Sequence, residues 1–221
     1  MIKHVFSDIG DVLMVWNGKK LCEDLSAVSE EPVDFFLERL VTKDNFSLQK
    51  YPLWALKCDK GELTGERLYA EILWASHLKI DYADFKKMWC GVIEPNEHGL
   101  DWLKKVQLSY TTSILSNIGD IHWAHLYDSV PVIKNCDDYV LSYQHNCVKP
   151  QKEIFKLSFK LACELRKDYF GEDLKLEECL FVDDRKSNCE AAQKFGFISI
   201  EYDLHKPKEF EEKLIKSGVV L

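Results

Sequence analysis

The chain has 221 residues, of which 46% are hydrophobic and 30% are charged, and its net charge is −8 at pH 7. This composition is typical of a globular protein and excludes a disordered chain. The length allows one good core with a smaller subdomain attached. The negative charge argues against nucleic acid as a partner, because binding a phosphate backbone needs a basic face. A small anionic substrate is still allowed, since a few local positive groups can hold it.

The sequence gives no sign of a membrane or secreted protein. No apolar run approaches the length of a membrane span, and Asp8 and Asp11 interrupt the only segment that could resemble a signal peptide. The eight cysteines are scattered and include no CxxC pair, which disfavours a disulfide framework and a zinc site. We therefore expect a cytoplasmic protein with reduced, mostly buried thiols.

Five short β-rich segments, separated in the later part of the chain by helical patterns, predict the main fold. Apolar residues at spacings of three and four predict helices over 151–167 and 187–195. Alternation of strands and helices predicts an α/β, Rossmann-like fold, in which helices cover both faces of a parallel five-stranded sheet. The predicted strands are residues 2–7, 111–116, 138–143, 178–183 and 197–202.

The first two predicted strands are separated by about 100 residues, which is too long for one crossover connection. Residues 20–90 show mostly helical spacing, so we predict a helical cap inserted after the first strand. We expect the cap tryptophans, Trp54, Trp74 and Trp89, to belong to its core. The predicted domains are a core of residues 1–14 and 91–221 and a cap of residues 15–90, with further core helices at 95–106 and near the C-terminus, before Gly218.

Polar residues follow four of these segments. Asp8 ends the first strand, Ser116 and Asn117 end the second, and Lys149 lies in the loop after the third. The pair Asp183–Asp184 ends the fourth strand. Because the carboxyl ends of parallel strands meet in the crevice where ligands bind, we expect these groups to share one site.

The chemistry of this group favours a metal ion and a phosphoryl substrate. Carboxylates that lie together repel unless a cation separates them, and acidic oxygen ligands without histidine favour Mg²⁺. A lysine and a serine hydroxyl beside Mg²⁺ suit a phosphoryl group. Asp8 could then attack phosphorus and form an aspartyl phosphate that water later breaks.

Four segments, each at a strand end and in the expected order, resemble the motifs of the haloacid dehalogenase (HAD) superfamily. They are VFSDIGDVL, ILSN, CVKPQKEIF and LFVDDRKSN. The position of the insertion resembles that of the helical-cap (C1) subgroup, and the first motif resembles a branch that acts on sugar phosphates. The resemblance implies that Asp8, the nucleophile, and Lys149 are catalytic and that Ser116, Asn117 and Lys149 bind phosphate. It also implies that Mg²⁺ is bound by Asp8, the Gly10 carbonyl, and Asp183 and Asp184, one of this pair directly and the other through water. Asn188 matches the asparagine that usually follows the acidic pair in this family.

Gly10 departs from the pattern of this family's phosphatases, in which a second aspartate usually stands two residues after the nucleophile as the general acid. Glycine cannot transfer a proton. We therefore expect a Mg²⁺-dependent phosphatase that acts on a small metabolite with a good leaving group, for example a sugar phosphate. Two alternatives are left open. One is a metal-independent haloacid dehalogenase, which the acidic pair disfavours. The other is an impaired HAD-fold protein that binds a phosphorylated ligand or partner.

Other candidate residues have weaker support. His122 and His125 are three apart on a predicted helix, but no third metal ligand is apparent. Trp16 is a candidate for the mouth of the site, and Asp11 is a candidate turn residue or substitute acid. Lys57 and Arg67 are candidates for reaching substrate from the cap, although solvated helix faces explain them equally well. Substrate identity and oligomeric state are left open by the sequence.

Overall fold

The computed structural model describes residues 1–41 and 53–220; residues 42–52, which belong to the predicted cap, and residue 221 lie outside the described part. Its centre is a five-stranded parallel sheet with the strand order β5-β4-β1-β6-β7, so the predicted α/β architecture is confirmed. The strands are β1 His4–Ser7, β4 Thr111–Ser116, β5 Asp138–Leu141, β6 Cys179–Asp183 and β7 Ile198–Glu201.

The first strand of the chain is the central strand of the sheet. β1 pairs with β4 on one side and with β6 on the other, and all four of its residues are buried. A strand buried on both faces and paired at both edges needs a short apolar run, which Val5 and Phe6 supply. The residue after this strand, Asp8, is therefore placed at the middle of the carboxyl edge of the sheet.

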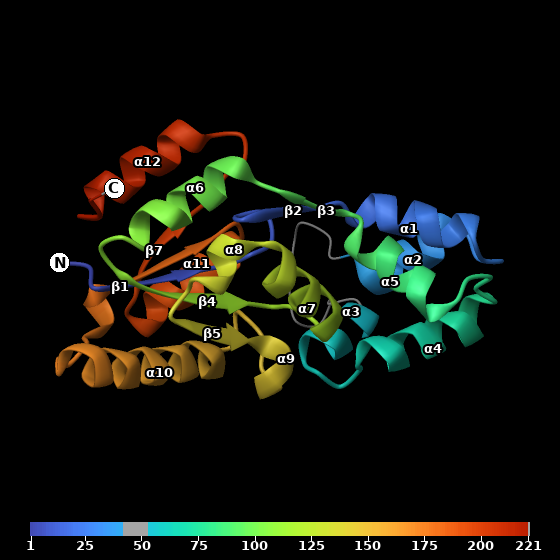
Figure 1. Cartoon of the computed structure of the whole chain (residues 1–221), viewed down its shortest axis with the longest axis horizontal. Helices are drawn as coiled ribbons and strands as arrows, with labels where there is room; N and C mark the ends of the chain where they lie inside the picture. The colour runs from blue at the N-terminus through green and yellow to red at the C-terminus, as the bar shows by residue number, and fades with distance from the viewer. Residues whose placement is uncertain (42–52, 221) are drawn as a thin grey trace.

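Helices cover both faces of the sheet, as Figure 1 shows. On one face, helices α6, α7, α8 and α12 contribute to one apolar cluster; on the other, α10 and α11 contribute to a second. These helices are α6 Glu97–Val106, α7 Asp120–Ser129, α8 Pro131–Lys134, α10 Lys152–Phe170, α11 Lys186–Phe195 and α12 Pro207–Lys216. The predicted helices at 95–106, 151–167 and 187–195 and near the C-terminus are all present.

Within the described residues, five further helices between the first two core strands form a separate group, drawn at the right of Figure 1. They bury an apolar cluster of their own, which includes Leu25, Phe36 and Phe85. A two-stranded antiparallel ribbon that the sequence did not predict, β2 Met14–Trp16 and β3 Ile93–Pro95, joins them to the sheet. We call this group the helical part. It consists of α1 Gly18–Ala27, α2 Val33–Leu40, α3 Leu53–Asp59, α4 Gly65–Ser76 and α5 Tyr82–Cys90. The predicted cap boundaries, residues 15–90, stay a prediction.

The three tryptophans expected in the core of the cap do not share one environment. Trp54 and Trp89 are buried, but Trp74 is 84% exposed, so the prediction for Trp74 is wrong. The buried face of α4 includes Leu68 and Ile72. A residue two positions after Ile72 lies on the opposite side of a helix of 3.6 residues per turn, which explains the exposure of Trp74.

The third predicted core strand is shorter than expected, because the chain leaves the sheet after Leu141. Residues Ser142–His145 form the short helix α9 instead of continuing the strand. The Ser142 hydroxyl accepts a hydrogen bond from the Ile118 N–H at 3.0 Å, which ties this turn to the loop after β4.

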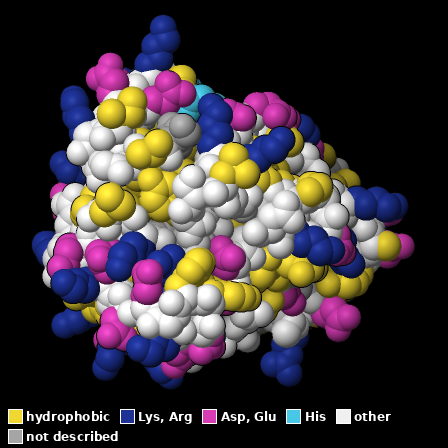
Figure 2. All heavy atoms as spheres, turned by 60° about the vertical axis from the view of Figure 1, so that its left-hand side comes forward, with side chains coloured by type: hydrophobic (Ala, Val, Ile, Leu, Met, Phe, Trp, Pro, Cys, Tyr) yellow, Lys and Arg dark blue, Asp and Glu magenta, His cyan; other side chains and the backbone are white. Residues whose placement is uncertain are grey.

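The surface carries charges of both signs. On the face shown in Figure 2, lysine and arginine side chains alternate with aspartate and glutamate side chains, and apolar side chains lie singly or in small groups between them. No helix within 1–41 and 53–220 has the length and apolar character of a membrane span.

Candidate active site

Asp8 is fixed at the end of β1 by both its backbone and its side chain. Its N–H donates to the Val182 carbonyl at 2.9 Å, which extends the pairing of β1 with β6 by one residue. Its carboxylate oxygen Oδ1 accepts the Ile9 N–H at 2.8 Å. The side chain is buried but lines a cavity at the edge of the sheet.

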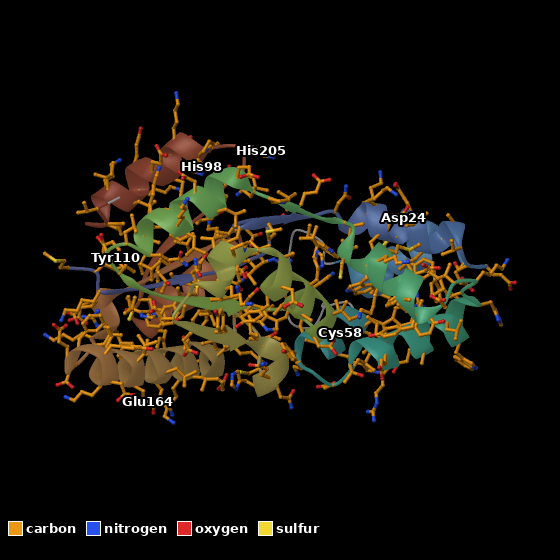
Figure 3. The ribbon with its side chains drawn as sticks, in the orientation of Figure 1. Asp24, Cys58, His98, Tyr110, Glu164 and His205 are labelled. Atoms are coloured by element: carbon orange, nitrogen blue, oxygen red, sulfur yellow. The ribbon has the colours of Figure 1, made fainter. Side chains whose placement is uncertain are left out.

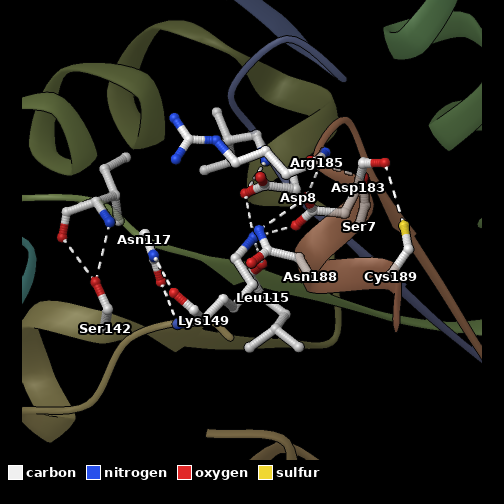
Figure 4. Close-up of polar contacts among 12 residues, drawn as sticks. Ser7, Asp8, Leu115, Asn117, Ser142, Lys149, Asp183, Arg185, Asn188 and Cys189 are labelled. Carbon is white, nitrogen blue, oxygen red and sulfur yellow. Dashed lines mark hydrogen bonds and ion pairs between the residues drawn. The ribbon is translucent and has the colours of Figure 1, made fainter. Parts of the chain in front are cut away.

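Lys149 reaches the same carboxylate from the loop after β5. The Asn117 amide holds this loop, because its Oδ1 accepts the Lys149 N–H at 2.8 Å and its Nδ2 donates to the Lys149 carbonyl at 3.0 Å. The Lys149 ammonium then meets three oxygens: Asp8 Oδ1 at 2.8 Å, Asp183 Oδ2 at 2.7 Å and the Leu115 carbonyl at 2.8 Å (Figure 4). All three of its N–H groups therefore have an acceptor.

The charge state of Lys149 follows from this environment. Burial by itself lowers the pKa of a lysine, but the carboxylates of Asp183 and Asp8 outweigh burial and raise the Lys149 pKa above its usual value. The ammonium is therefore protonated at neutral pH and places a positive charge 2.8 Å from Oδ1 of Asp8.

The acidic pair that ends β6 divides into a buried residue and a partly buried one. Asp183 Oδ1 accepts the Arg185 N–H at 2.8 Å and the Asn188 side-chain amide at 2.9 Å, so Asn188 orients this carboxylate. Burial raises the pKa of Asp183, and burial followed by the charges of Asp183 and Asp8 raises that of Asp184. Both carboxyl groups would therefore be favoured as carboxylates by a nearby cation.

The donor set fits a divalent cation of the Mg²⁺ type. Asp8, Asp183 and Asp184 each offer a carboxylate oxygen, and these oxygens lie within 4.8 Å of one another. Three carboxylates and the Lys149 ammonium have a net charge of −2, which one Mg²⁺ ion would balance. A set of hard oxygen donors is the kind that Mg²⁺ prefers.

A cavity of about 190 Å³ lies above these groups, between the edge of the sheet and the helical part. The predicted residues that line it are Asp8, Gly10, Ser116, Asn117, Lys149 and Asp184; Asp183 lies beneath them. The helical part and the β2 ribbon contribute Trp16, Cys58, Asp59 and Trp89 to the lining, among others. Trp16 thus borders the cavity, whereas Lys57 and Arg67 do not line it.

Several cavity residues were not singled out from the sequence. Arg185 directly follows the acidic pair, and this position was the available signal. Asp59 and Asp120 line the cavity from positions outside the four motifs, Asp120 three residues after the end of ILSN. His122, which the sequence offered as a candidate metal ligand, lines the cavity too. Its Nε2 bonds to the Trp89 carbonyl at 3.1 Å and burial lowers its pKa to about 4, as is typical of a neutral structural histidine.

The structure gives Gly10 more room than its sequence position suggests. A Cβ atom at this residue would meet nothing within 4 Å, and its φ lies outside the left-handed region. The neighbouring Asp11 does adopt a left-handed φ of 50°, and its Oδ1 accepts the Trp16 N–H at 3.3 Å. Asp11 therefore acts as the turn residue between β1 and β2, while also lining the cavity.

No protein-family model matches the chain, but solved structures define the class of its fold. A HAD-family enzyme from Bacteroides thetaiotaomicron, solved with magnesium and inorganic phosphate, is 24% identical and has a TM-score of 0.74; the alignment covers 92% of this chain and 96% of that one. A HAD-like hydrolase from Porphyromonas gingivalis is 22% identical, with a TM-score of 0.74 and 98% coverage of both chains. The chain therefore has the fold of the haloacid dehalogenase superfamily, as its motifs predict.

Two further likenesses bear on the choice of reaction. Among curated proteins, D-ribitol-5-phosphate phosphatase from Bacteroides thetaiotaomicron is 24% identical over 210 residues, which are 91% of this chain and 92% of that protein. The L-2-haloacid dehalogenase from Xanthobacter autotrophicus shares the fold at a TM-score of 0.59 and 18% identity, with 100% of this chain and 85% of that one covered.

Proposed function

We propose that this protein is a Mg²⁺-dependent phosphatase that hydrolyses a small phosphorylated metabolite through an aspartyl-phosphate intermediate. The observation that carries the proposal is the convergence of Asp8, Asp183 and Asp184 with Lys149, whose ammonium lies 2.8 Å from Asp8 and 2.7 Å from Asp183. The similarity to a curated phosphatase and to a structure solved with magnesium and phosphate supports the same reaction.

The residues divide the work in a defined way. Lys149 and the Ile9 N–H hold Oδ1 of Asp8, so Oδ2 is the oxygen that attacks phosphorus. A bond forms between Oδ2 and phosphorus, and the bond to the leaving oxygen breaks with its electron pair. Water then breaks the aspartyl phosphate and releases phosphate, which restores Asp8. Ser116 and the backbone of Asn117 would orient the phosphoryl oxygens, since the Asn117 side chain is bonded to Lys149.

Mg²⁺, bound by Asp8, Asp183, Asp184 and the Gly10 carbonyl, would neutralise the charge of the phosphoryl oxygens. Asn188 and the Arg185 N–H prepare this site by fixing Asp183.

The substrate class that we favour is a phosphorylated sugar or sugar alcohol, because the curated relative is a D-ribitol-5-phosphate phosphatase. Within this class, the missing acid at Gly10 favours an anomeric phosphate, because its leaving oxygen is less basic than that of a sugar-alcohol phosphate and departs with little protonation. A cytoplasmic location remains part of the proposal.

The test is phosphate release from an aryl phosphate and from a panel of phosphorylated sugars, sugar alcohols and small acids. We expect activity in magnesium, loss of activity in EDTA, and loss of activity in Asp8→Asn. Asp24→Asn is a matched control, because Asp24 is a carboxylate of the helical part that pairs with Lys20 and does not line the cavity. This control should retain full activity.

Two results would redirect the proposal. Chloride release from 2-chloropropionate without metal would favour the dehalogenase, whose fold this chain shares. A protein that releases no phosphate from any substrate, yet gains thermal stability from a phosphorylated ligand, would be the impaired binding protein.

A further inference from the structure

The first turn of α7 is inserted between parts of the molecule that lie far apart in the sequence. Ile121, although it follows a core strand, is buried within the apolar cluster of the helical part. Its carbonyl faces Cys90 Sγ at 4.0 Å, and the next residue, His122, bonds to the Trp89 carbonyl. The C-terminal end of α5 thus holds this turn from one side.

Asp120 holds the turn from the other side. Both of its carboxylate oxygens lie 3.0 Å from the Gly65 N–H, and Oδ1 also accepts the Ile121 N–H at 2.9 Å. Gly65 is the first residue of α4, so the carboxylate lies at the positive end of that helix dipole. One side chain therefore bonds at the same time to the first turn of α7 and to the start of α4.

Close backbone approach accompanies this contact. A methyl group at Gly65 would overlap Cγ1 and Cδ1 of Ile121, and one at Gly61 would overlap the Tyr143 carbonyl oxygen. A Cβ at Gly119 would reach the Cβ of Cys58 at 3.4 Å. Figure 3 shows Cys58 on α3, where the helical part meets the part that contains the sheet. The segment from α3 to α4 is therefore packed against the α7 turn and α9 with little space between them.

The α7 turn is also continuous with the phosphate-binding loop of the proposed site. Asp120 is four residues after Ser116, and Asn117 between them clamps the backbone of Lys149. Asp120 and Ile121 both line the cavity. A contact that fixes Asp120 therefore bears on the loop that carries Ser116 and on the position of the helices above it.

We propose that Asp120 is a positioning residue, which locks the start of α4 onto the loop of residues 116–120 and so keeps the helical part closed over the phosphoryl site. The proposal rests on the phosphatase function for its kinetic consequence. Closure limits access of bulk water and keeps the loop in the geometry that the reaction needs, and the carboxylate oxygens of Asp120 are engaged by the Gly65 and Ile121 N–H groups.

Amide exchange tests the lock without using activity. The Gly65 N–H is the hydrogen that Asp120 holds, so we expect Asp120→Ala to speed its exchange by about ten- to a hundredfold, in line with loss of a hydrogen bond to a charged group. Asp81→Ala is the matched control: Asp81 caps α5 by accepting the Asp84 N–H at 2.9 Å, but it is away from the cavity. Asp81→Ala should leave Gly65 exchange unchanged.

Kinetics test the consequence. At a temperature where all variants are folded, we expect Asp120→Ala to lower kcat by about ten- to a hundredfold, whereas Asp81→Ala loses thermal stability but no kcat. Asp120→Asn keeps one oxygen acceptor and should recover most of the loss. Gly65→Ala should also lower kcat, and a Gly65→Ala/Ile121→Ala double variant should recover part of it by removing the overlapping atoms.

The outcomes separate this proposal from the phosphatase assignment. Unchanged Gly65 exchange in Asp120→Ala would overturn the lock, whatever the protein's activity. Faster exchange with an unchanged kcat would overturn the positioning role, because the contact would then only cap helices. A wild-type protein without phosphatase activity would refute the proposed function, while the exchange result would still decide whether the lock exists.

Discussion

Substituting aspartate for Gly10 should convert the site into one that can protonate a leaving group. The side chain would stand two residues after the proposed nucleophile, at the edge of the cavity. Its carboxyl group would lie close to Asp8 and Asp184, whose charges would raise its pKa and keep it available as a proton donor.

The structure allows this change at little cost to folding. Nothing lies within 4 Å of a Cβ at Gly10, and its φ is one that ordinary residues adopt. Replacing a glycine in such a position lowers the entropy of the unfolded chain, a gain of about 0.4–1 kcal/mol that offsets part of the added charge repulsion. General acid catalysis is worth about 10²–10⁴-fold, so we expect kcat/KM to rise by up to that factor when leaving-group protonation limits the rate.

The assay compares two phosphate esters in magnesium. The leaving group of an aryl phosphate departs without protonation, whereas that of an alkyl phosphate needs a proton. Gly10→Asp should therefore raise kcat/KM on the alkyl ester and change it little on the aryl ester. Gly10→Asn is the matched control, because it has the same size and cannot donate a carboxyl proton. It should show no gain on either ester.

A Gly10→Asp protein that keeps the wild-type melting temperature and magnesium dependence, yet shows no gain on the alkyl ester, would refute this reasoning. The rate would then be limited by a step other than protonation, or another group would already supply the proton.

Three further predictions concern charge. Lys149→Met leaves Asp8 and Asp183 without their buried counter-charge, so we expect loss of activity. Urea denaturation without magnesium should show a free energy of unfolding lower by about 3–5 kcal/mol. Wild-type stability in this variant would contradict the role of Lys149 as the buried counter-charge. Magnesium should raise Tm more at pH 8 than at pH 5. Burial raises the pKa of Asp183 and Asp184, so protons compete with the cation for these carboxylates at low pH. An equal shift in Tm at both pH values would count against a metal site made of these carboxylates. Burial, and then Arg166, lower the pKa of His4 to about 3, so between about pH 6.5 and 3 only the unfolded chain binds a proton at this residue. As the pH falls through this range, the free energy of unfolding should decrease by about 1.4 kcal/mol per pH unit. His4→Phe should flatten this pH dependence, and an unchanged slope would mean that another group causes it.

The main architecture could be predicted because its signals are local. Each core strand is a short apolar run, and the strand ends were placed within a few residues. Asp8, Lys149 and Asp184 could be assigned to one site because parallel strands bring their carboxyl ends together. The notable misses are those that depend on tertiary context. Nothing in the spacing of Trp74 shows which face of α4 is buried, and the two strands of the β2–β3 ribbon are too short to give a periodic signal.

The cavity above the nucleophile was harder to predict than the nucleophile itself. Asp120 and His122 follow a recognisable motif, but their partners, Gly65 and Trp89, lie on helices that no motif connects to them. The role of Asn117 also changes with the structure, because its side chain bonds to the Lys149 backbone and only its backbone is left for a phosphoryl group. Such long-range pairings are set by packing, which the sequence pattern does not encode.

The central position of β1 has a consequence for synthesis on the ribosome. β1 pairs with β4, which is made about 100 residues later, and with β6, which is made about 170 residues later. The nascent chain must therefore carry Val5 and Phe6 without their partner strands over that interval, and the site is complete only after the aspartates of β6 have been made. Premature termination before residue 184 should yield a chaperone-dependent, inactive fragment instead of a weak enzyme.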